Sequence, residues 1–331
     1  MPSFTPMFSY TASRGRLRSH YGLWREKNNR VDLPQDFILT IQNTYGRAGD
    51  RFLNSLPDFI NEAASRWNLT GLQAVPNLSY NFVAFAKDGH RQVVLKIGVP
   101  SRELTSEITA LRLFDGRGAV RLLIADEPRG MFLLERLQPG RMLADFDDDE
   151  QTVHIAADVM LALWRAAPSG RNLIQLSDWF EGFKQLRARF AGGTGPFNEE
   201  LVGRAEGLVQ ELFAEDYAPM LIHGDLHHFN ILTSGLGWLA IDPKGVIGPA
   251  AYEVGPLLLN PWKDLSDGTA ILRMTQRRIG ILSERLGFEQ ERIRAWGLAH
   301  AVLSAWWSLE GKGGWEYPMN FAGLLARLGL N

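Results

Sequence analysis

A histidine, two aspartates and an asparagine lie close together in the stretch Leu221–Pro256, namely His223, Asp225, Asn230 and Asp242. An aspartate can orient an attacking hydroxyl group and accept its proton, while an asparagine and a second aspartate can hold the Mg²⁺ that bridges nucleotide phosphates. In phosphoryl-transfer enzymes of this type the asparagine follows the base by five residues, as Asn230 follows Asp225. The spacing predicts Asp225 as the base, Asn230 and Asp242 as magnesium ligands, and His223 as a hydrogen-bonding brace of the loop.

Short strands have to bring these residues together. The apolar runs Ile231–Leu232 and Trp238–Ile241 are too brief for helices and predict two strands, with Ser234–Gly237 as the turn that returns Asp242 toward Asn230. Alternatively, each polar residue caps a turn or ends a strand, as polar loop residues often do. That alternative explains each residue alone but not the ordered set.

A second group of candidate residues lies in the first half of the chain. Ser79–Ala86 and Arg91–Ile97 predict a hairpin around Asp88-Gly89. Lys96 then places a cation on an otherwise apolar strand, and in kinases such a lysine contacts the α- and β-phosphates of ATP. The alternative is a charge that protects an edge strand from aggregation.

The segment after this strand offers a partner for the lysine. Ser101 is the expected N-cap of a helix that carries Glu107, with Glu103 as the competing candidate. For both glutamates the alternative is a solvated helix face.

The motif H-G-D-x-x-x-x-N at 223–230, followed by Ile241-Asp242, resembles that of the aminoglycoside phosphotransferases and other small-molecule kinases with a protein-kinase-like fold. The stretches LKIGVP (95–100), MFLLERLQPG (131–140) and Asp-Pro-Lys-Gly (242–245) are similar to the streptomycin 6-kinase and hydroxyurea kinase branch. The resemblance spans residues 33–328 and implies an α+β, two-lobed fold. It implies an N-lobe at 33–136 with a small antiparallel sheet and a helical extension, and a mainly helical C-lobe at 137–331 with the catalytic loop and acceptor pocket. Residues 1–32 form an N-terminal extension without an assigned function.

The resemblance also implies ATP and Mg²⁺ as cofactors. The hinge at 135–140 pairs with adenine through the backbone of Glu135 and Leu137, and Lys96 with Glu107 binds the phosphates. Ser79 lies in the segment that covers the phosphates, which contains no glycine at 77–81, unlike the glycine-rich loop of protein kinases. Lys244 either steadies the transferring phosphate or makes a surface salt bridge.

The implied partner is a small hydroxylated acceptor, with streptomycin phosphorylated at its 6 position, an antibiotic-resistance activity, as the leading candidate. Hydroxyurea or another metabolite stays open. The acidic run at 145–150 either starts a helix or attracts a cationic acceptor. A non-catalytic nucleotide-binding protein is the alternative from another class. A protein kinase is disfavoured because no Ala-Pro-Glu segment follows Asp242 and little chain separates it from Tyr252-Glu253.

Composition and net charge narrow the classes of partner and the location expected for this protein. A net charge of −2 argues against nucleic acid as a partner, and the absence of cysteine fits a reducing cytosol, so we expect a cytoplasmic protein. No apolar run approaches the length of a membrane span, and the N-terminus lacks the order of a signal peptide. His223 and His227 have zinc-like spacing only on a helix, and a loop is expected there, with His227 and His228 undecided between surface and acceptor contacts.

Helical periodicity is expected elsewhere. The predicted helical segments are 33–67, 153–166, 176–191, 198–215, 268–286, 289–310 and 319–328. Tryptophans cluster near the C-terminus, and we expect most of them in the core, with one or two as possible lining of an acceptor pocket.

Overall fold

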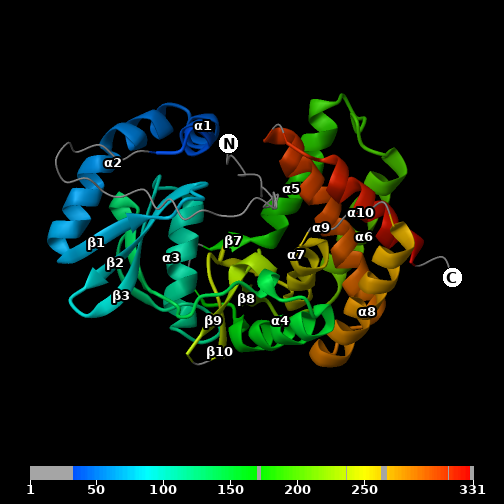
Figure 1. Cartoon of the computed structure of the whole chain (residues 1–331). Coiled ribbons are helices and arrows are strands. Elements are labelled where there is room, and N and C mark those ends of the chain that lie inside the picture. The colour runs from blue at the N-terminus through cyan, green and yellow to red at the C-terminus, as the bar shows by residue number, and fades with distance from the viewer. Residues whose placement is uncertain (1–32, 170–172, 236, 262–266, 312, 329–331) are drawn as a thin grey trace. The chain divides into compact units, whose positions relative to one another are not determined.

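The computed structural model describes residues 33–169, 173–235, 237–261, 267–311 and 313–328, which divide into two compact units. Unit 1 contains residues 33–116 and 120–138, and unit 2 contains residues 117–119 and the described part of 139–328. Unit 1 is built on an antiparallel sheet and unit 2 is mainly helical, so the chain is α+β as predicted (Figure 1). The predicted N-terminal extension at 1–32 lies outside the described residues.

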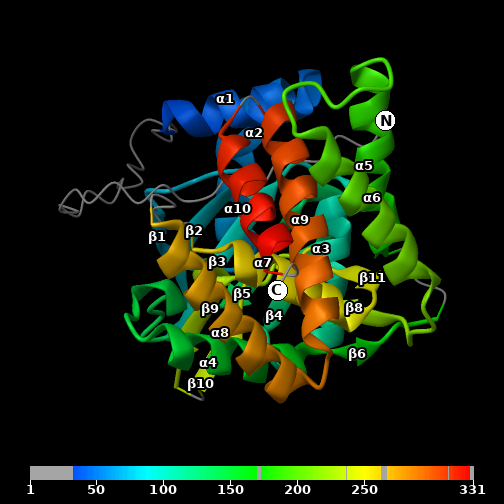
Figure 2. The same ribbon diagram turned by 90° about the vertical axis from the view of Figure 1, so that its right-hand side faces the viewer.

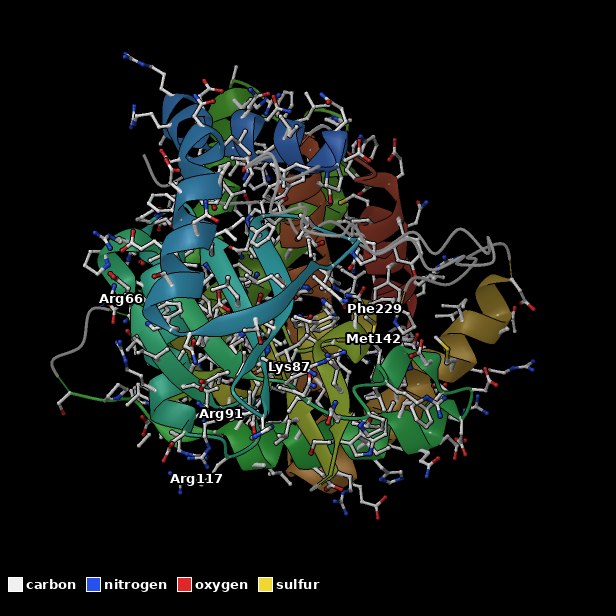
Figure 3. The ribbon with its side chains drawn as sticks, turned by 60° about the vertical axis from the view of Figure 1, so that its left-hand side comes forward. Arg66, Lys87, Arg91, Arg117, Met142 and Phe229 are labelled. Atoms are coloured by element: carbon white, nitrogen blue, oxygen red, sulfur yellow. The ribbon has the colours of Figure 1, made fainter. Side chains whose placement is uncertain are left out.

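The sheet of unit 1 has the strand order β1-β2-β3-β5-β4. Its strands are β1 (Leu69–Ala74), β2 (Asn81–Asp88), β3 (Arg91–Gly98), β4 (Leu122–Asp126) and β5 (Met131–Glu135). Gly89 closes the β2–β3 hairpin with a φ of +59°, a backbone conformation that glycine adopts readily. Figure 3 labels Lys87 and Arg91 on the two strands beside this turn. The predicted hairpin is confirmed.

Opposite faces of β3 carry different side chains because residues alternate along a strand. Val93, Leu95 and Ile97 belong to a core cluster that also contains the buried faces of the helices α1 (Gln35–Tyr45) and α2 (Arg47–Arg66). Lys96 lies on the other face, where it meets the helix α3 (Arg102–Phe114). The predicted helical segment at 33–67 is present, divided at Gly46, which has a φ of +52°.

Unit 2 is organised around the buried helix α9. The helices of this unit are α4 (Asp149–Leu163), α5 (Leu176–Arg189), α6 (Glu199–Ala214), α7 (Val254–Leu259), α8 (Gly268–Leu286), α9 (Gln290–Glu310) and α10 (Glu316–Arg327). Figure 2 shows α9 and α10 side by side, with α6 and α8 on either side of them. Trp296, Trp306 and Trp307 of α9 are at most 3% exposed, which confirms them as core residues. No helix among the described residues is long and apolar enough to cross a membrane.

Short strands of unit 2 frame the loops that carry the candidate catalytic residues. One sheet has the order β6-β8-β11-β7, and a separate hairpin pairs β9 with β10. The strands are β6 (Arg165–Ala166), β7 (Ile174–Gln175), β8 (Met220–Ile222), β9 (Ile231–Ser234), β10 (Gly237–Ala240) and β11 (Val246–Gly248). The predicted strands flanking the turn near 234–237 are therefore confirmed.

The acidic run before α4 serves the fold. Asp148 is the N-cap of α4 and accepts a hydrogen bond from the Gln151 N–H at 3.0 Å, so the helix begins four residues before the predicted Val153. Asp145 accepts a hydrogen bond from the Met142 N–H at 3.2 Å. Asp149 pairs with Arg278 of α8, whose side chain is 1% exposed and whose Nη1 also donates to the Asn260 carbonyl at 2.9 Å.

The Asp149–Arg278 pair predicts a large loss of stability for Asp149→Asn. Removing one partner leaves the buried guanidinium without its counter-charge, and we expect the free energy of unfolding to fall by about 3 kcal/mol in urea titrations. Asp158→Asn is the matched control, because it breaks the exposed Arg285–Asp158 pair between the same two helices and should cost less than about 1 kcal/mol. Equal decreases in the free energy of unfolding for both variants would show that the buried pair stabilises the fold no more than the exposed pair does.

Candidate active site

The β9–β10 hairpin brings the predicted magnesium ligands of unit 2 to neighbouring backbone positions. Asn230 ends a 3-10 turn, η3 (His228–Asn230), directly before β9, and Asp242 lies two residues after β10. The Ile241 N–H donates to the Asn230 carbonyl at 2.9 Å, which fixes the return of the chain. Asp242 has a φ of +59°, in the left-handed region that non-glycine residues seldom occupy. A strained backbone residue at this point fits a functional position.

His223 joins the loop of Asp225 to the segment around Asp242. Its Nε2–H donates to the Ile241 carbonyl at 2.8 Å, and its Nδ1 accepts from the Asp225 N–H at 3.2 Å. Its own carbonyl accepts from the Lys244 N–H at 2.8 Å. Burial lowers the pKa of His223 to about 3, so the ring is neutral at physiological pH and carries one donor and one acceptor. With both ring nitrogens in hydrogen bonds, His223 braces the loop and is not a zinc ligand.

Glu253 is a structural residue of this loop that the sequence reasoning missed. Its carboxylate is fully buried and accepts hydrogen bonds from the N–H groups of His223 at 2.7 Å and Gly224 at 2.8 Å. Burial raises the pKa of Glu253 to about 7, against the opposing effect of these N–H groups and that of Leu226. The available signal was a single acidic residue within the apolar run 250–259, since buried acids occur almost only with partners.

Asp225 is buried, with His227 and Lys244 facing its carboxylate. Asp225 Oδ1 lies 3.4 Å from His227 Nε2, and Asp225 Oδ2 lies 3.7 Å from Lys244 Nζ. Burial raises the pKa of Asp225, while His227 and then Lys244 lower it. The Asn230 amide nitrogen donates to the Asp225 carbonyl at 3.0 Å, which leaves Asn230 Oδ1 as the atom available to a metal ion.

Unit 1 contains the other group of predicted residues. Lys96 Nζ lies 2.6 Å from Glu107 Oε1, and both side chains are buried, so the lysine pairs with Glu107 rather than with Glu103. Ser101 caps α3 by accepting a hydrogen bond from the Leu104 N–H at 3.2 Å, which sets where the helix begins. The buried cation is thus held by a helix whose start is fixed by its cap.

The predicted hinge and phosphate-covering residues also lie in unit 1. Glu135 ends β5, and its carboxylate accepts a hydrogen bond from the Arg121 N–H at 2.8 Å. In an antiparallel pair the Arg121 N–H would normally donate to the Glu135 carbonyl. Here it donates to the Glu135 side chain instead. Leu137 follows at 8% exposure, and Ser79 is exposed in the segment between β1 and β2.

The site and fold together define a class of protein. Unit 2 contains a hydrogen-bonded H-G-D loop and the β9–β10 hairpin, and unit 1 contains a buried strand lysine. Such parts on an α+β scaffold are typical of small-molecule phosphotransferases with a protein-kinase-like fold. A solved ternary complex of a thermostable mutant of aminoglycoside phosphotransferase APH(4)-Ia with ADP and hygromycin B has this fold, with a TM-score of 0.59, 15% identity, and coverage of 84% of this chain and 99% of that chain.

The chain belongs to the aminoglycoside/hydroxyurea antibiotic resistance kinase family, whose model matches residues 70–311. It is 31% identical over 284 residues to a streptomycin 6-kinase of Streptomyces glaucescens, which covers 85% of this chain and 92% of that protein. It is also 31% identical over 287 residues to a hydroxyurea phosphotransferase of Kitasatospora aureofaciens, which covers 85% of this chain and 81% of that protein. The family shows that the chain is a phosphotransferase.

The anchoring role of Glu253 predicts a loss of stability and activity for Glu253→Gln. The amide keeps one acceptor oxygen but turns an NH₂ group toward a backbone N–H, so one buried donor loses its partner and the free energy of unfolding should fall by about 1–3 kcal/mol. We expect kcat to fall as well, because the loop of Asp225 loses an anchor. Glu284→Gln, at an exposed position of α8, is the control. Wild-type stability in Glu253→Gln would contradict the anchoring role.

A second buried pair lies next to Glu253. The Tyr252 hydroxyl and His300 Nδ1 are 2.9 Å apart, and both residues are fully buried. Burial lowers the pKa of His300 to about 3. The ring therefore stays neutral in the folded protein at pH values where an exposed histidine is already protonated.

This pair predicts that acid weakens the fold through His300. Between about pH 6.5 and pH 3 the unfolded chain binds a proton that the folded ring does not, so the free energy of unfolding falls by about 1.4 kcal/mol per pH unit on acidification. His300→Asn keeps an acceptor for Tyr252 and should reduce this slope by about one proton in urea titrations at pH 5.5 and pH 4. His154→Asn, at an exposed position of α4, is the control variant. An unchanged slope in His300→Asn would refute the prediction.

Proposed function

We propose that the protein is an ATP- and Mg²⁺-dependent phosphotransferase that phosphorylates a hydroxyl group of a small molecule, with streptomycin at its 6 position as the leading acceptor. The observation that carries the proposal is the buried Asp225 carboxylate in a loop anchored by His223 and Glu253, within a chain of this kinase family. A fixed aspartate five residues before a metal-binding asparagine is the arrangement that phosphoryl transfer to a hydroxyl requires.

In unit 2, Asp225 orients the acceptor hydroxyl and takes its proton. Asn230 Oδ1 and the Asp242 carboxylate hold Mg²⁺, which prefers oxygen ligands and neutralises charge on the phosphates when it is bound. The donor set fits this ion, because the Asn230 amide nitrogen is turned to the Asp225 carbonyl and its oxygen is left for a cation. Lys244, which is 41% exposed and faces Asp225, steadies the transferring phosphate.

In unit 1, Lys96 binds the α- and β-phosphates of ATP and Glu107 holds the lysine in place. The Glu135 carbonyl and the Leu137 N–H pair with adenine. This assignment is supported by the Arg121 N–H, which donates to the Glu135 side chain and not to the Glu135 carbonyl. Ser79 contacts the phosphates from the segment before β2. The homologous fold of a phosphotransferase bound to ADP supports an adenine nucleotide as the donor.

The acceptor is proposed from the relatives. The likeness to a streptomycin 6-kinase favours a cationic, hydroxylated acceptor, and the equal identity to a hydroxyurea phosphotransferase makes hydroxyurea the second candidate. The acidic run at 145–150 gives little support to a cation-attracting rim, since Asp145, Asp148 and Asp149 are engaged within unit 2.

The proposal predicts acceptor-dependent release of ADP. Streptomycin should raise ADP release above the rate with ATP alone, with hydroxyurea and hygromycin B tested beside it, and ³¹P NMR of the product should identify the phosphorylated hydroxyl. Asp225→Asn should lower kcat by about 10²–10⁴-fold because the base is lost. Lys96→Met should raise the KM for ATP and lower kcat.

Two exposed residues give matched controls for this experiment. Lys87→Met on β2 and Asp147→Asn before α4 change the same residue types outside the proposed site and should keep wild-type kinetics. Nucleotide binding without ADP release for any hydroxylated compound would favour the non-catalytic nucleotide-binding alternative. Full acceptor-dependent turnover in Asp225→Asn would remove Asp225 from the chemistry.

A further inference from the structure

The two oxygens of the Asp225 carboxylate have different surroundings. Oδ1 is buried and has no hydrogen-bond partner within normal geometry among the described residues, and the polar atom facing it is His227 Nε2 at 3.4 Å. Oδ2 faces Lys244 Nζ at 3.7 Å, and that side chain is 41% exposed. One oxygen therefore faces a partly buried ring, and the other faces a side chain that is more exposed to solvent.

The imidazole of His227 is held with Nε2 toward this carboxylate. Its ring packs edge-to-face against the Phe229 ring at a centroid distance of 5.8 Å, and its side chain is only 16% exposed. Phe229, labelled in Figure 3, belongs to η3, which contacts the neighbouring 3-10 turn at Leu143–Asp145. The ring therefore packs against Phe229 with most of its surface shielded from solvent.

The side chain of Asn230 is a second polar neighbour of His227 Nε2. The Asn230 amide nitrogen also lies 3.4 Å away, but it already donates to the Asp225 carbonyl and, as an NH₂ group, it cannot accept a hydrogen bond. Of these two neighbours in the described part of the chain, only Asp225 Oδ1 can accept a hydrogen from Nε2. An anionic acceptor also makes the stronger hydrogen bond.

We propose that His227 is a positioning residue that donates from Nε2 to Asp225 Oδ1 and thereby reserves Oδ2 for the acceptor hydroxyl. This inference rests on the proposed function. The 3.4 Å separation is longer than a formed hydrogen bond, and such contacts in catalytic sites commonly shorten when substrate binds.

The assignment fixes where the proton goes. The acceptor O–H bond breaks as its oxygen forms a bond to the γ-phosphorus of ATP, the bond from that phosphorus to the bridging oxygen breaks, and ADP leaves. The proton passes to Asp225 Oδ2. His227 keeps its own hydrogen throughout, because its part is to stop the carboxylate from rotating.

Glutamine and asparagine at position 227 separate the two ring nitrogens. The glutamine amide nitrogen reaches about as far as Nε2 of histidine, whereas the asparagine amide nitrogen reaches only about as far as Nδ1. We expect His227→Gln to keep kcat within about threefold of wild type, and His227→Asn and His227→Leu to lose about 10–100-fold, the usual loss when a residue that orients a functional group is removed. The KM for ATP should stay unchanged in all three variants.

The measurements are kcat and KM for streptomycin and for ATP, with thermal unfolding to verify folding, and His154→Gln on α4 as the control. Equal losses in His227→Gln and His227→Asn, or a full rate in His227→Leu, would overturn the inference. If His227→Leu does not fold, the glutamine–asparagine pair decides. Asp225→Asn is run in the same assay: an inactive Asp225→Asn beside a fully active His227→Leu refutes only the role of His227, whereas an active Asp225→Asn refutes the proposed base itself.

Discussion

The hydrogen bonds from two consecutive backbone N–H groups to the buried Glu253 carboxylate are the interaction on which the loop of Asp225 depends. They hold His223 and Gly224 at the end of β8, and His223 in turn holds the Asp225 backbone and the Ile241 carbonyl. Burying a carboxylate without hydrogen-bond partners would cost free energy. The loop conformation that supplies the two N–H donors is therefore stabilised by Glu253. The Asp225 backbone and the segment that leads into Asp242 are thereby held by hydrogen bonds that begin at one buried acid.

Unit 1 also contains a buried charge that is stabilised by a partner, and here the charge is a cation. Lys96 is 3% exposed on β3, and its charge is tolerated because Glu107 of α3 lies 2.6 Å away. The alternation of the strand turns Lys96 away from the core cluster that contains Leu95 and Ile97. The strand β3 places Lys96 on the face that meets α3, and α3 provides the counter-charge of Glu107. The ion pair therefore forms only when both elements are folded.

The features that could be predicted from the sequence depend on local patterns. The β2–β3 hairpin follows from Asp88-Gly89, α3 from the cap at Ser101, and the β9–β10 return from short apolar runs around a turn. Helices were predicted in unit 2 where α4, α5, α6, α8, α9 and α10 lie, whereas the short buried helix α7 was not predicted. The first strand, β1, was missed because only Leu69 is buried along it, so no alternation is visible in the sequence.

The features that could not be predicted depend on partners far apart in the chain. Glu253 anchors a residue 30 positions away, and Arg278 pairs with Asp149 across 129 positions. No local pattern encodes such a pairing, so an acidic run that was compatible with a cation-attracting rim turned out to contain a helix cap and an ion-pair partner.

The left-handed backbone at Asp242 has a consequence for engineering. A glycine would occupy this conformation at lower energetic cost, so a selection that rewards thermal tolerance alone would favour losing the carboxylate. Position 242 should therefore be sequenced in variants selected for thermal tolerance, because a variant there would lose the carboxylate proposed to bind magnesium.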